Sequence, residues 1–516
     1  MKPKNSSKEK TCPEICFISL LTVIFLLNSV SAEPNELWSK ITDGDSDYSR
    51  STVAVDSDKN ILVINGYTNS SCVDNCGSWE INWDFCLTKY DPEGNVIWKK
   101  TAGGDFRDFG YGVAVDSENN IIVTGITNSF GRGLMSDALT IKYDSNGNIL
   151  WNKTAGGGSW DHFRDVAVDS KNNIIVTGNT HSFGSENSDV WTIEYDSNGN
   201  ILWNKTTGGD DFEEGLGVAI DSGNNIIVTG YKRGFTRSFG EDFDVWTIKY
   251  DANGNQLWNK TAGKDDFEEG VDVAVDSKNN IIVTGFTGPS SAGNDGLDVW
   301  TIKYDANGNQ LWNKTAGGDR YDSGSGVAVD SDNNIFVVAT TNSFRIEDNG
   351  IWIIEYDPNG NIIWDKKVEG NYSRSGVAVD SNDNIIVTGY TPSYRAGHFD
   401  LRMIKYTTSE IKKIKEKKIV TDTTGEKIND VGENASAKKE VSEQVKKDIN
   451  DSTKKISEEE IEKIFGKLDE DKTEGYIKDE EAKEREIGWK GYTLLGVGIL
   501  ILILLFIQVK KFKKSG

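Results

Sequence analysis

The sequence predicts an all-β fold: a seven-bladed β-propeller with four strands per blade, followed by a charged stalk and one C-terminal transmembrane helix. Three observations support this prediction. A V-A-[VI]-D string recurs every 50 to 60 residues, each copy holds four short strand-like segments, and the two ends of the repeat region are offset by one strand. The seven strings end at Asp56, Asp116, Asp169, Asp221, Asp276, Asp330 and Asp380.

The fifth copy shows the four segments most clearly, at residues 271–276, 280–287, 298–305 and 309–315. All four are rich in β-branched or aromatic residues and are bounded by turn residues, as strands are. The first link reads DSKNN and the third reads DANGN, whose Asn-Gly pair is a strong hairpin signal. A small residue, usually glycine, follows the apolar run of each second strand, as Gly125 does, and indicates close backbone approach or a bulge.

The ends of the repeat region are complementary. The last copy stops at residues 401–406 (LRMIKY), without the Leu-Trp strand of the other copies. Residues 36–40 (ELWSK) supply a strand of that kind near the start of the chain. Pairing of the two would complete the last blade, close the ring and remove exposed sheet edges.

Both ends of the chain have features that direct a protein to a membrane. Residues 1–32 resemble a signal peptide, with lysines, a short apolar run and a Val-Ser-Ala cleavage site. Residues 491–509 predict a transmembrane helix, followed by a basic cytoplasmic tail at 510–516. We therefore expect a single-pass cell-membrane protein whose ectodomain, residues 33–406, lies outside. Residues 407–490 form the charged stalk, partly helical or disordered.

The net charge of −24 makes nucleic acid an unfavourable partner, because phosphate backbones repel acidic chains. Cys72, Cys76 and Cys86 cluster in one stretch of the exported part. They are disulfide candidates, with free thiols and, less favoured, a metal site as the alternatives.

The pattern GVAVD…NNIIVTG…DVWTIKYD…NGNILWNKT resembles the prokaryotic cell-surface β-propeller repeat family called SBBP. The resemblance covers about residues 34–406. The first two strands are also similar to NHL-type repeats, and Asp144, Gly147 and Trp151 are similar to the tryptophan-docking element of PQQ-type propellers, with one residue fewer. The resemblance implies a surface-exposed propeller and supplies no catalytic residues.

Links one and three are tight turns, so the long second link and the link between copies share the opposite face. We expect function on this long-loop face, because binding residues concentrate on variable loops of a rigid scaffold. Its acidic residues suit calcium or a basic partner, although a repeated loop also needs acidic residues to cap its turns. Some aromatic and basic residues break the repeat pattern there, Arg164 and Arg374 among them. The candidate ligand-binding residues are Asp210, Asp211, Glu213, Glu214, Asp265, Asp266, Glu268, Glu269, Trp160, His162, Arg320 and Tyr321.

Eight asparagines stand in N-x-[ST] sequons and are glycosylation candidates, if the host has the machinery. They are Asn69, Asn152, Asn204, Asn259, Asn313, Asn371, Asn434 and Asn450.

The sequence favours a binding or interaction module for an extracellular protein or glycan. The alternatives are an enzyme, such as a hydrolase or lyase acting on the long-loop face, and a structural role in the cell envelope. The three histidines lie outside any catalytic motif, and no cofactor or metal fingerprint occurs in the sequence, so we predict no catalytic residues, no resident metal and no cofactor beyond calcium.

Overall fold

The computed structural model describes residues 34–46, 51–69, 83–131, 135–185, 187–234, 242–263, 267–289, 296–343, 350–370, 374–392 and 399–407. Its regular secondary structure in these ranges consists of strands alone. None of the described residues forms a helix long and apolar enough to cross a membrane. The predicted leader, membrane helix and tail lie outside these ranges, and so does the predicted stalk apart from Thr407, which ends β28 (Phe399–Thr407).

The strands are grouped into seven repeats in chain order. Repeat 1 has β2 (Thr52–Val55), β3 (Ile61–Asn69), β4 (Trp83–Tyr90) and β5 (Val96–Ala102). Repeat 2 has β6 (Asp108–Val115), β7 (Ile121–Thr127), β8 (Asp137–Tyr143) and β9 (Ile149–Ala155). Repeat 3 has β10 (Asp161–Val168), β11 (Ile174–Thr180), β12 (Asp189–Tyr195) and β13 (Ile201–Thr207). Repeat 4 has β14 (Glu213–Ile220), β15 (Ile226–Gly234), β16 (Asp242–Tyr250) and β17 (Gln256–Ala262).

The remaining repeats follow the same order. Repeat 5 has β18 (Phe267–Val275), β19 (Ile281–Gly288), β20 (Asp298–Tyr304) and β21 (Gln310–Ala316). Repeat 6 has β22 (Asp322–Val329), β23 (Ile335–Thr341), β24 (Gly350–Tyr356) and β25 (Ile362–Glu369). Repeat 7 has β26 (Gly376–Val379), β27 (Ile385–Pro392), β28 (Phe399–Thr407) and, from the start of the chain, β1 (Asn35–Ser46).

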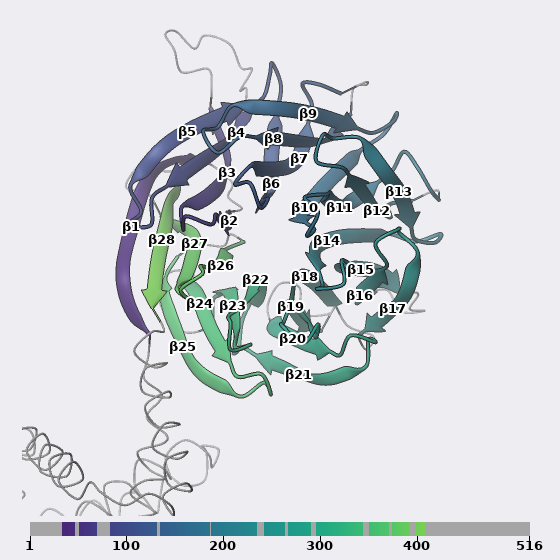
Figure 1. Ribbon diagram of the computed structural model, residues 1–516. Coiled ribbons are helices and arrows are strands. Elements are labelled where there is room, and N and C mark those ends of the chain that lie inside the picture. Colours follow the sequence, from purple (N-terminus) through teal and green to yellow (C-terminus); the bar gives the residue numbers. More distant parts are fainter. Residues whose placement is uncertain are drawn as a thin grey trace, which may run out of the picture. The chain divides into compact units, whose positions relative to one another are not determined.

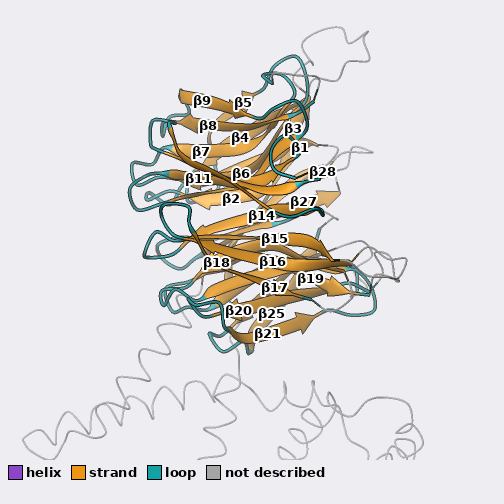
Figure 2. Ribbon diagram, turned by 90° about the vertical axis from the view of Figure 1, so that its right-hand side faces the viewer, coloured by secondary structure: helices purple, strands orange, loops and turns teal. Residues whose placement is uncertain are grey.

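Each repeat pairs its strands in chain order as an antiparallel sheet, and one parallel pair, Phe243 with Phe267, joins repeats 4 and 5. The first strand of each repeat lies toward the centre and the fourth lies at the rim (Figure 1). Loops gather at the two ends of the strands (Figure 2). β1 pairs antiparallel with β28, with Ser39 opposite Ile404, so the N-terminal strand is the fourth strand of the last sheet, as the sequence predicts.

A bulge marks the recurring glycine. The register of β6 and β7 shifts between Gly110 and Gly112, opposite Gly125. A Cβ atom on Gly125 would lie 1.8 Å from the carbonyl oxygen of Phe109, so only glycine fits without a backbone shift. The predicted close backbone approach is therefore confirmed at this position.

The core lies between neighbouring sheets. β7 and β8 are buried along their whole length, because adjacent repeats cover both faces of each sheet. Ile122 of repeat 2, for example, packs in one cluster with Phe163, Val176 and Ile193 of repeat 3. Burying each such side chain contributes roughly 1.5–3 kcal/mol.

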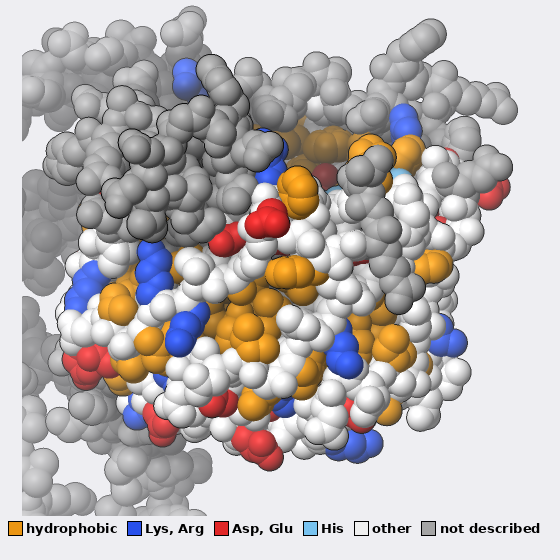
Figure 3. Space-filling view, turned by 90° about the horizontal axis from the view of Figure 1, so that it is seen from above, with side chains coloured by type: hydrophobic (Ala, Val, Ile, Leu, Met, Phe, Trp, Pro, Cys, Tyr) orange, Lys and Arg blue, Asp and Glu red, His pale blue; other side chains and the backbone are white. Residues whose placement is uncertain are grey.

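The rim is more open. Val96, Ile97, Ile149 and Leu150 on the outer strands β5 and β9 are each about half exposed. Figure 3 views the molecule from the side of these strands and shows hydrophobic side chains among polar ones on the outer surface. Lysines such as Lys153 lie on the same strands, and such charges discourage edge-to-edge pairing with other chains.

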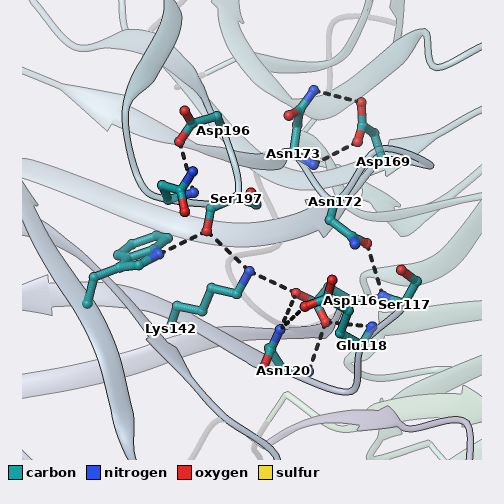
Figure 4. Close-up of polar contacts among 12 residues, drawn as sticks. Asp116, Ser117, Glu118, Asn120, Lys142, Asp169, Asn172, Asn173, Asp196 and Ser197 are labelled. Atoms are coloured by element: carbon teal, nitrogen blue, oxygen red, sulfur yellow. Dashed lines mark hydrogen bonds and ion pairs between the residues drawn. The ribbon is translucent and has the colours of Figure 1, made fainter.

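A buried polar network joins the tight-turn ends of the repeats (Figure 4). In repeat 2, Asp116 Oδ1 accepts from the backbone N–H groups of Glu118 and Asn120 and so holds the first turn. Asp116 Oδ2 lies 2.8 Å from Lys142 Nζ, which also donates to the carbonyl oxygen of Ser197 in repeat 3 at 3.3 Å. One lysine thus fixes a turn in its own repeat and contacts a turn in the next.

A tryptophan strengthens the same junction. Trp151 Nε1 donates to the carbonyl oxygen of Ser197 at 3.1 Å. Its ring packs on Gly199, whose φ of +81° is a left-handed conformation that favours glycine. Because the fourth strand of one repeat is docked on the third link of the next, neighbouring sheets are held in a fixed relation.

A second contact between neighbouring repeats involves the turn after the first strand of each repeat. Asn172, at φ 64°, accepts with its side chain from the backbone N–H of Ser117 in the preceding repeat. Asn119, Asn224, Asn279, Asn333 and Asp383 make the same contact from their own repeats. Repeat 1 has Lys59 at this position, and an ammonium group cannot accept a hydrogen bond. The junction of repeats 7 and 1 therefore depends on other contacts.

Two repeats depart from the lysine pattern. Repeat 3 has Glu194, and repeat 6 has Glu355, where five repeats have lysine. Glu194 is 3% exposed, and Asn173 Nδ2 donates both to Glu194 at 2.9 Å and to Asp169 at 3.1 Å. Burial, and then the charge of Asp169, raise the pKa of the Glu194 carboxyl. Repeat 3 thus buries two neighbouring carboxyl groups where repeat 2 buries an ion pair.

The substitution Glu194→Lys should stabilise the protein. It restores a cation beside Asp169 and removes carboxylate repulsion, so we expect the free energy of unfolding at pH 7 to rise by about 1–3 kcal/mol. The pKa of Glu194 in the folded state lies above the ordinary 4.5, so ionised Glu194 destabilises the folded state as the pH rises above 4.5. The stabilisation by Glu194→Lys should therefore be smaller in acid. Denaturant unfolding at pH 4 and pH 7 measures this. Lys142→Glu is the reverse control; a stabilising effect of that change would contradict the explanation.

The substitution Gly199→Ala should be destabilising. The added Cβ would lie 2.8 Å from Lys153 Cε and 3.1 Å from the Trp151 ring, at a φ of +81°, so we expect a loss of about 1–2 kcal/mol. Gly158→Ala is the matched control, because no atom lies within 4 Å of its Cβ position. Equal melting temperatures for the two variants would show that the packing of Trp151 on residue 199 tolerates rearrangement.

Candidate functional site

The inner strands converge on the axis of the fold. A cavity of about 130 Å³ there is lined by residues of all seven repeats. Its lining residues are Ser51, Thr52, Val53, Val113, Asp165, Leu216, Asp272, Ser325, Gly326, Arg374, Ser375, Gly376 and Val377. Backbone N–H groups of Val218 and Val327 donate to Asp165 and Asp272, so these two carboxylates hold neighbouring strands together.

A second cavity, the axial pocket, shares Leu216 and Arg374 with the first and has a volume of about 260 Å³. It is lined by Tyr111, Arg164, Glu214, Leu216, Tyr231, Glu269 and Arg374. The β-strand alternation explains the set, because side chains two residues apart face the same side, as Glu214 and Leu216 do on β14. The pocket therefore gathers two cations, two anions and two phenols from five repeats.

The charges of the axial pocket are paired loosely. Arg164 Nη2 lies 3.5 Å from Glu214 Oε2, and Arg374 Nη2 lies 3.6 Å from Glu269 Oε2. Charge-assisted hydrogen bonds between such groups are ordinarily about 2.7–2.9 Å long. The Arg164 guanidinium lies over the Tyr111 ring at 5.1 Å, and its buried Nε has no hydrogen-bond partner among the described residues. The arginine thus has donor capacity left for a further group.

Burial shifts the acid–base properties of the pocket. It raises the pKa of Glu269, which the nearby Arg374 partly offsets. Burial, followed by the charges of Glu214 and Glu269, raises the pKa of Tyr231 well above its usual range. The Tyr231 phenol therefore stays protonated at neutral pH, and its O–H donates a hydrogen bond to Glu214.

Of the acidic residues predicted for the long-loop face, the structure brings Glu214 and Glu269 together in the axial pocket. Asp210 is exposed and Asp211 is partly exposed outside it. Asp265 and Asp266 lie outside the described residues.

The prediction of an exposed acidic rim is wrong for Glu213 and Glu268, because both side chains are buried. Glu213 is 5% exposed and accepts from the backbone N–H of Gly209, while Glu268 is 2% exposed and accepts from Thr287 Oγ1 at 3.0 Å. Asp161 caps the corresponding loop of repeat 3 through Gly157 N–H. These acids hold the loops between repeats, which is the structural alternative drawn from the sequence.

The aromatic candidates of repeat 3 are not among the residues that line the axial pocket. Trp160 is 50% exposed and contacts the His181 ring edge-on, with centroids 6.0 Å apart; His181 in turn contacts Phe212 at 6.5 Å. His162 Nε2 is hydrogen-bonded to Ser136 Oγ at 2.9 Å. Burial and the nearby Arg164 lower the pKa of His162 to about 4, so it is neutral at pH 7.

The two candidates of repeat 6 lie apart from the axial pocket. Arg320 is exposed and its backbone N–H donates to Ser343 Oγ. Tyr321 packs against a small cluster of Val271, Phe286 and Leu297.

Sequence reasoning missed Tyr111 and Tyr231 and ranked Arg164 and Arg374 only as departures from the repeat. Tyr111 and Arg164 both stand five residues before the aspartate of their V-A-V-D string. The other repeats have leucine, valine or serine there, so variation at this one inner position was the available signal. Tyr231 follows the recurring glycine of β15, a position that no pattern marked.

The remaining candidates give mixed outcomes. Cys86 is a free, buried thiol, so it is not a disulfide partner in this structure; Cys72 and Cys76 lie outside the described residues. Within the described ranges, no three His, Cys, Asp or Glu side chains are grouped as metal ligands. The sequon residues Asn152, Asn204, Asn259 and Asn313 are exposed on outer strands, and Asn69 ends β3. Asn371, Asn434 and Asn450 lie outside the described residues.

Comparison with known proteins yields distant relatives. The chain is 23% identical over 407 residues to an uncharacterized WD repeat-containing protein of Acanthamoeba polyphaga mimivirus; the match covers 55% of this chain and 29% of the viral protein. An ulvan lyase bound to a saccharide has a TM-score of 0.44 at 11% identity, covering 70% of this chain and 95% of its own. The β-propeller domain of the trilobed protease from Pyrococcus furiosus has a TM-score of 0.37 at 9% identity, covering 72% and 95%.

The profile of one repeat family also matches the chain. It is SBBP, described as a beta-propeller repeat, and it matches residues 315–345, from the end of β21 through β23. This match confirms the resemblance to SBBP repeats for residues 315–345, which contain an SBBP β-propeller repeat.

Proposed function

We propose that this chain is a seven-bladed propeller, closed by β1 and held outside a cell membrane, that binds an extracellular protein or glycan in its axial pocket. Contacts between repeats 1 and 7 support the closure. The backbone N–H of Ser51 donates to the carbonyl oxygen of Arg374 at 3.1 Å, and Val53 and Tyr90 pack in one cluster with Tyr390 and Met403.

The axial pocket is the observation that carries the binding proposal. It places two arginines and two glutamates in a partly buried space, at distances too long for strong ion pairs. Taking charged groups out of water costs free energy unless they are well paired, so such an arrangement is poor for stability alone. Loosely paired buried charges are characteristic of sites that complete their hydrogen bonds with a ligand.

Tyr231 is poorly suited to act as a catalytic base, whereas the raised pKa of the buried Glu269 is compatible with binding and with acid–base catalysis alike. A tyrosine that acts as a base needs a lowered pKa, whereas burial raises the pKa of Tyr231. The neutral His162 is already hydrogen-bonded to Ser136. An enzyme remains the alternative, and it would use the same pocket; it is distinguished by conversion of the bound ligand.

The membrane location rests on the sequence. A leader with a short apolar run precedes the propeller, and an 18-residue uncharged segment with four lysines directly after it ends the chain. Both features agree on one topology, with the propeller outside. The stalk would then hold the axial pocket away from the bilayer.

Arg164→Ala should weaken ligand binding by the full-length chain at least about ten-fold. The change removes the Nε donor, which has no partner among the described residues. Saturable binding of extracellular protein and glycan fractions, with mass spectrometry of the bound ligand before and after incubation, measures both binding and conversion. Arg320→Ala is the matched control, an exposed arginine outside the pocket. Equal loss in both variants would contradict the assignment to the axial pocket.

Deleting residues 491–516 should release the protein from cells, because it removes the predicted membrane helix and tail. Fractionation of intact cells measures this, and protease treatment should digest the propeller while sparing a tag at the C-terminus of the full chain. Retention of the truncated protein inside cells would contradict an exported, C-terminally anchored protein.

A further inference from the structure

The axial pocket is balanced in formal charge. Arg164 and Arg374 face Glu214 and Glu269, so the charges of the four side chains cancel when both glutamates are ionised. Glu269 interacts electrostatically with both arginines and with Glu214, and Glu214 interacts with Arg164. The four side chains therefore influence one another. A ligand with a net charge would place a further, uncompensated charge in this space, which is costly where water is scarce.

A neutral ligand that both donates and accepts hydrogen bonds suits the pocket better. Hydroxyl groups can donate to the glutamates and accept from the arginines, and neither contact changes the charge balance. The Nε of Arg164 has no partner among the described residues and can donate to a ligand hydroxyl. The volume of about 260 Å³ lies just below the usual range for drug-sized ligands and fits one compact polar unit.

Exposed aromatic side chains stand close in sequence to two of the pocket residues, directly before β10 and β14. Phe212 precedes Glu214 by two residues and Trp160 precedes Arg164 by four, which is roughly 7 and 13 Å along an extended chain. Phe212 is 39% exposed and Trp160 is 50% exposed, with His181 between their rings. Exposed rings next to polar groups offer flat apolar faces to ligands that are part apolar and part polar.

Resting on the proposed function, we propose that the ligand is a neutral glycan. Its terminal sugar enters the axial pocket and hydrogen-bonds to the arginines and glutamates. The following sugars stack their C–H faces on Trp160 and Phe212. Sugar rings combine the two requirements, since each has hydroxyl groups at its edge and an apolar face.

The test titrates the full-length chain in detergent by calorimetry. The panel contains neutral oligosaccharides of one to four gluco-, galacto- or manno-configured units, uronate-containing oligosaccharides, and cationic and zwitterionic peptides. We expect binding of neutral saccharides only, tighter with each added unit up to three. The affinity should be nearly the same at 0.05 and 0.5 M salt, because no net charge is exchanged.

Variants separate the two parts of the site. Glu269→Gln should weaken binding of every saccharide about ten-fold or more, because the amide replaces an ionic acceptor. Trp160→Ala should weaken binding of tri- and tetrasaccharides several-fold while leaving the monosaccharide unchanged. Glu118→Gln, exposed on the tight-turn face, and Leu150→Ala, 52% exposed on the rim, are the matched controls and should have no effect.

The possible outcomes separate the class of the ligand from the location of the binding site. Preference for uronate saccharides or peptides, still lost in Glu269→Gln, overturns the neutral glycan and leaves the axial pocket as the binding site. Neutral-glycan binding that Glu269→Gln and Arg164→Ala leave intact overturns both the pocket and this inference. Absence of binding to the whole panel, by protein whose thermal unfolding matches that of the wild type, also overturns the neutral-glycan ligand.

Discussion

The fold depends on the buried aspartate at the end of each inner strand. Asp116 shows its role: one carboxylate oxygen holds the turn that follows, and the other pairs with Lys142, which also contacts the next repeat. Such a pair is net favourable only because both groups have further hydrogen bonds that replace those lost to water. The tryptophan packed on the next repeat adds apolar contact at the same junction. Every later feature of the molecule relies on repeats held in this fixed relation.

Repeats held in a fixed relation can place unfavourable groups together where their inner strands meet. Inner strands from different repeats place Arg164, Glu214, Glu269 and Arg374 near one axis, although they are far apart in the chain. Their loose pairing would be lost if neighbouring sheets could slide, because the side chains would then find closer partners. The charged pocket therefore depends on the polar turn network, which keeps neighbouring sheets in fixed positions.

Much of the fold was predictable because the recurring sequence strings mark the length of each repeat. Strand positions, tight turns and the pairing of β1 with β28 all follow from short strings that recur, and Gly125 even indicated the bulge. The axial pocket was only half predictable. Glu214 and Glu269 were selected for their charge, but so were Glu213 and Glu268, whose side chains point the other way on the same strands. Tyr231 could not be found, because its place depends on how repeats 3, 4 and 5 meet in space.

We infer that the axial charges serve a ligand and not the fold. The unfolding free energy of the double variant Arg164→Met with Glu214→Leu tests it most directly, without requiring any ligand. Replacing a ligand-binding ion pair with apolar side chains of similar size should leave stability unchanged or raise it. A loss of about 3 kcal/mol or more would show that the pair holds neighbouring repeats together and that its role is structural.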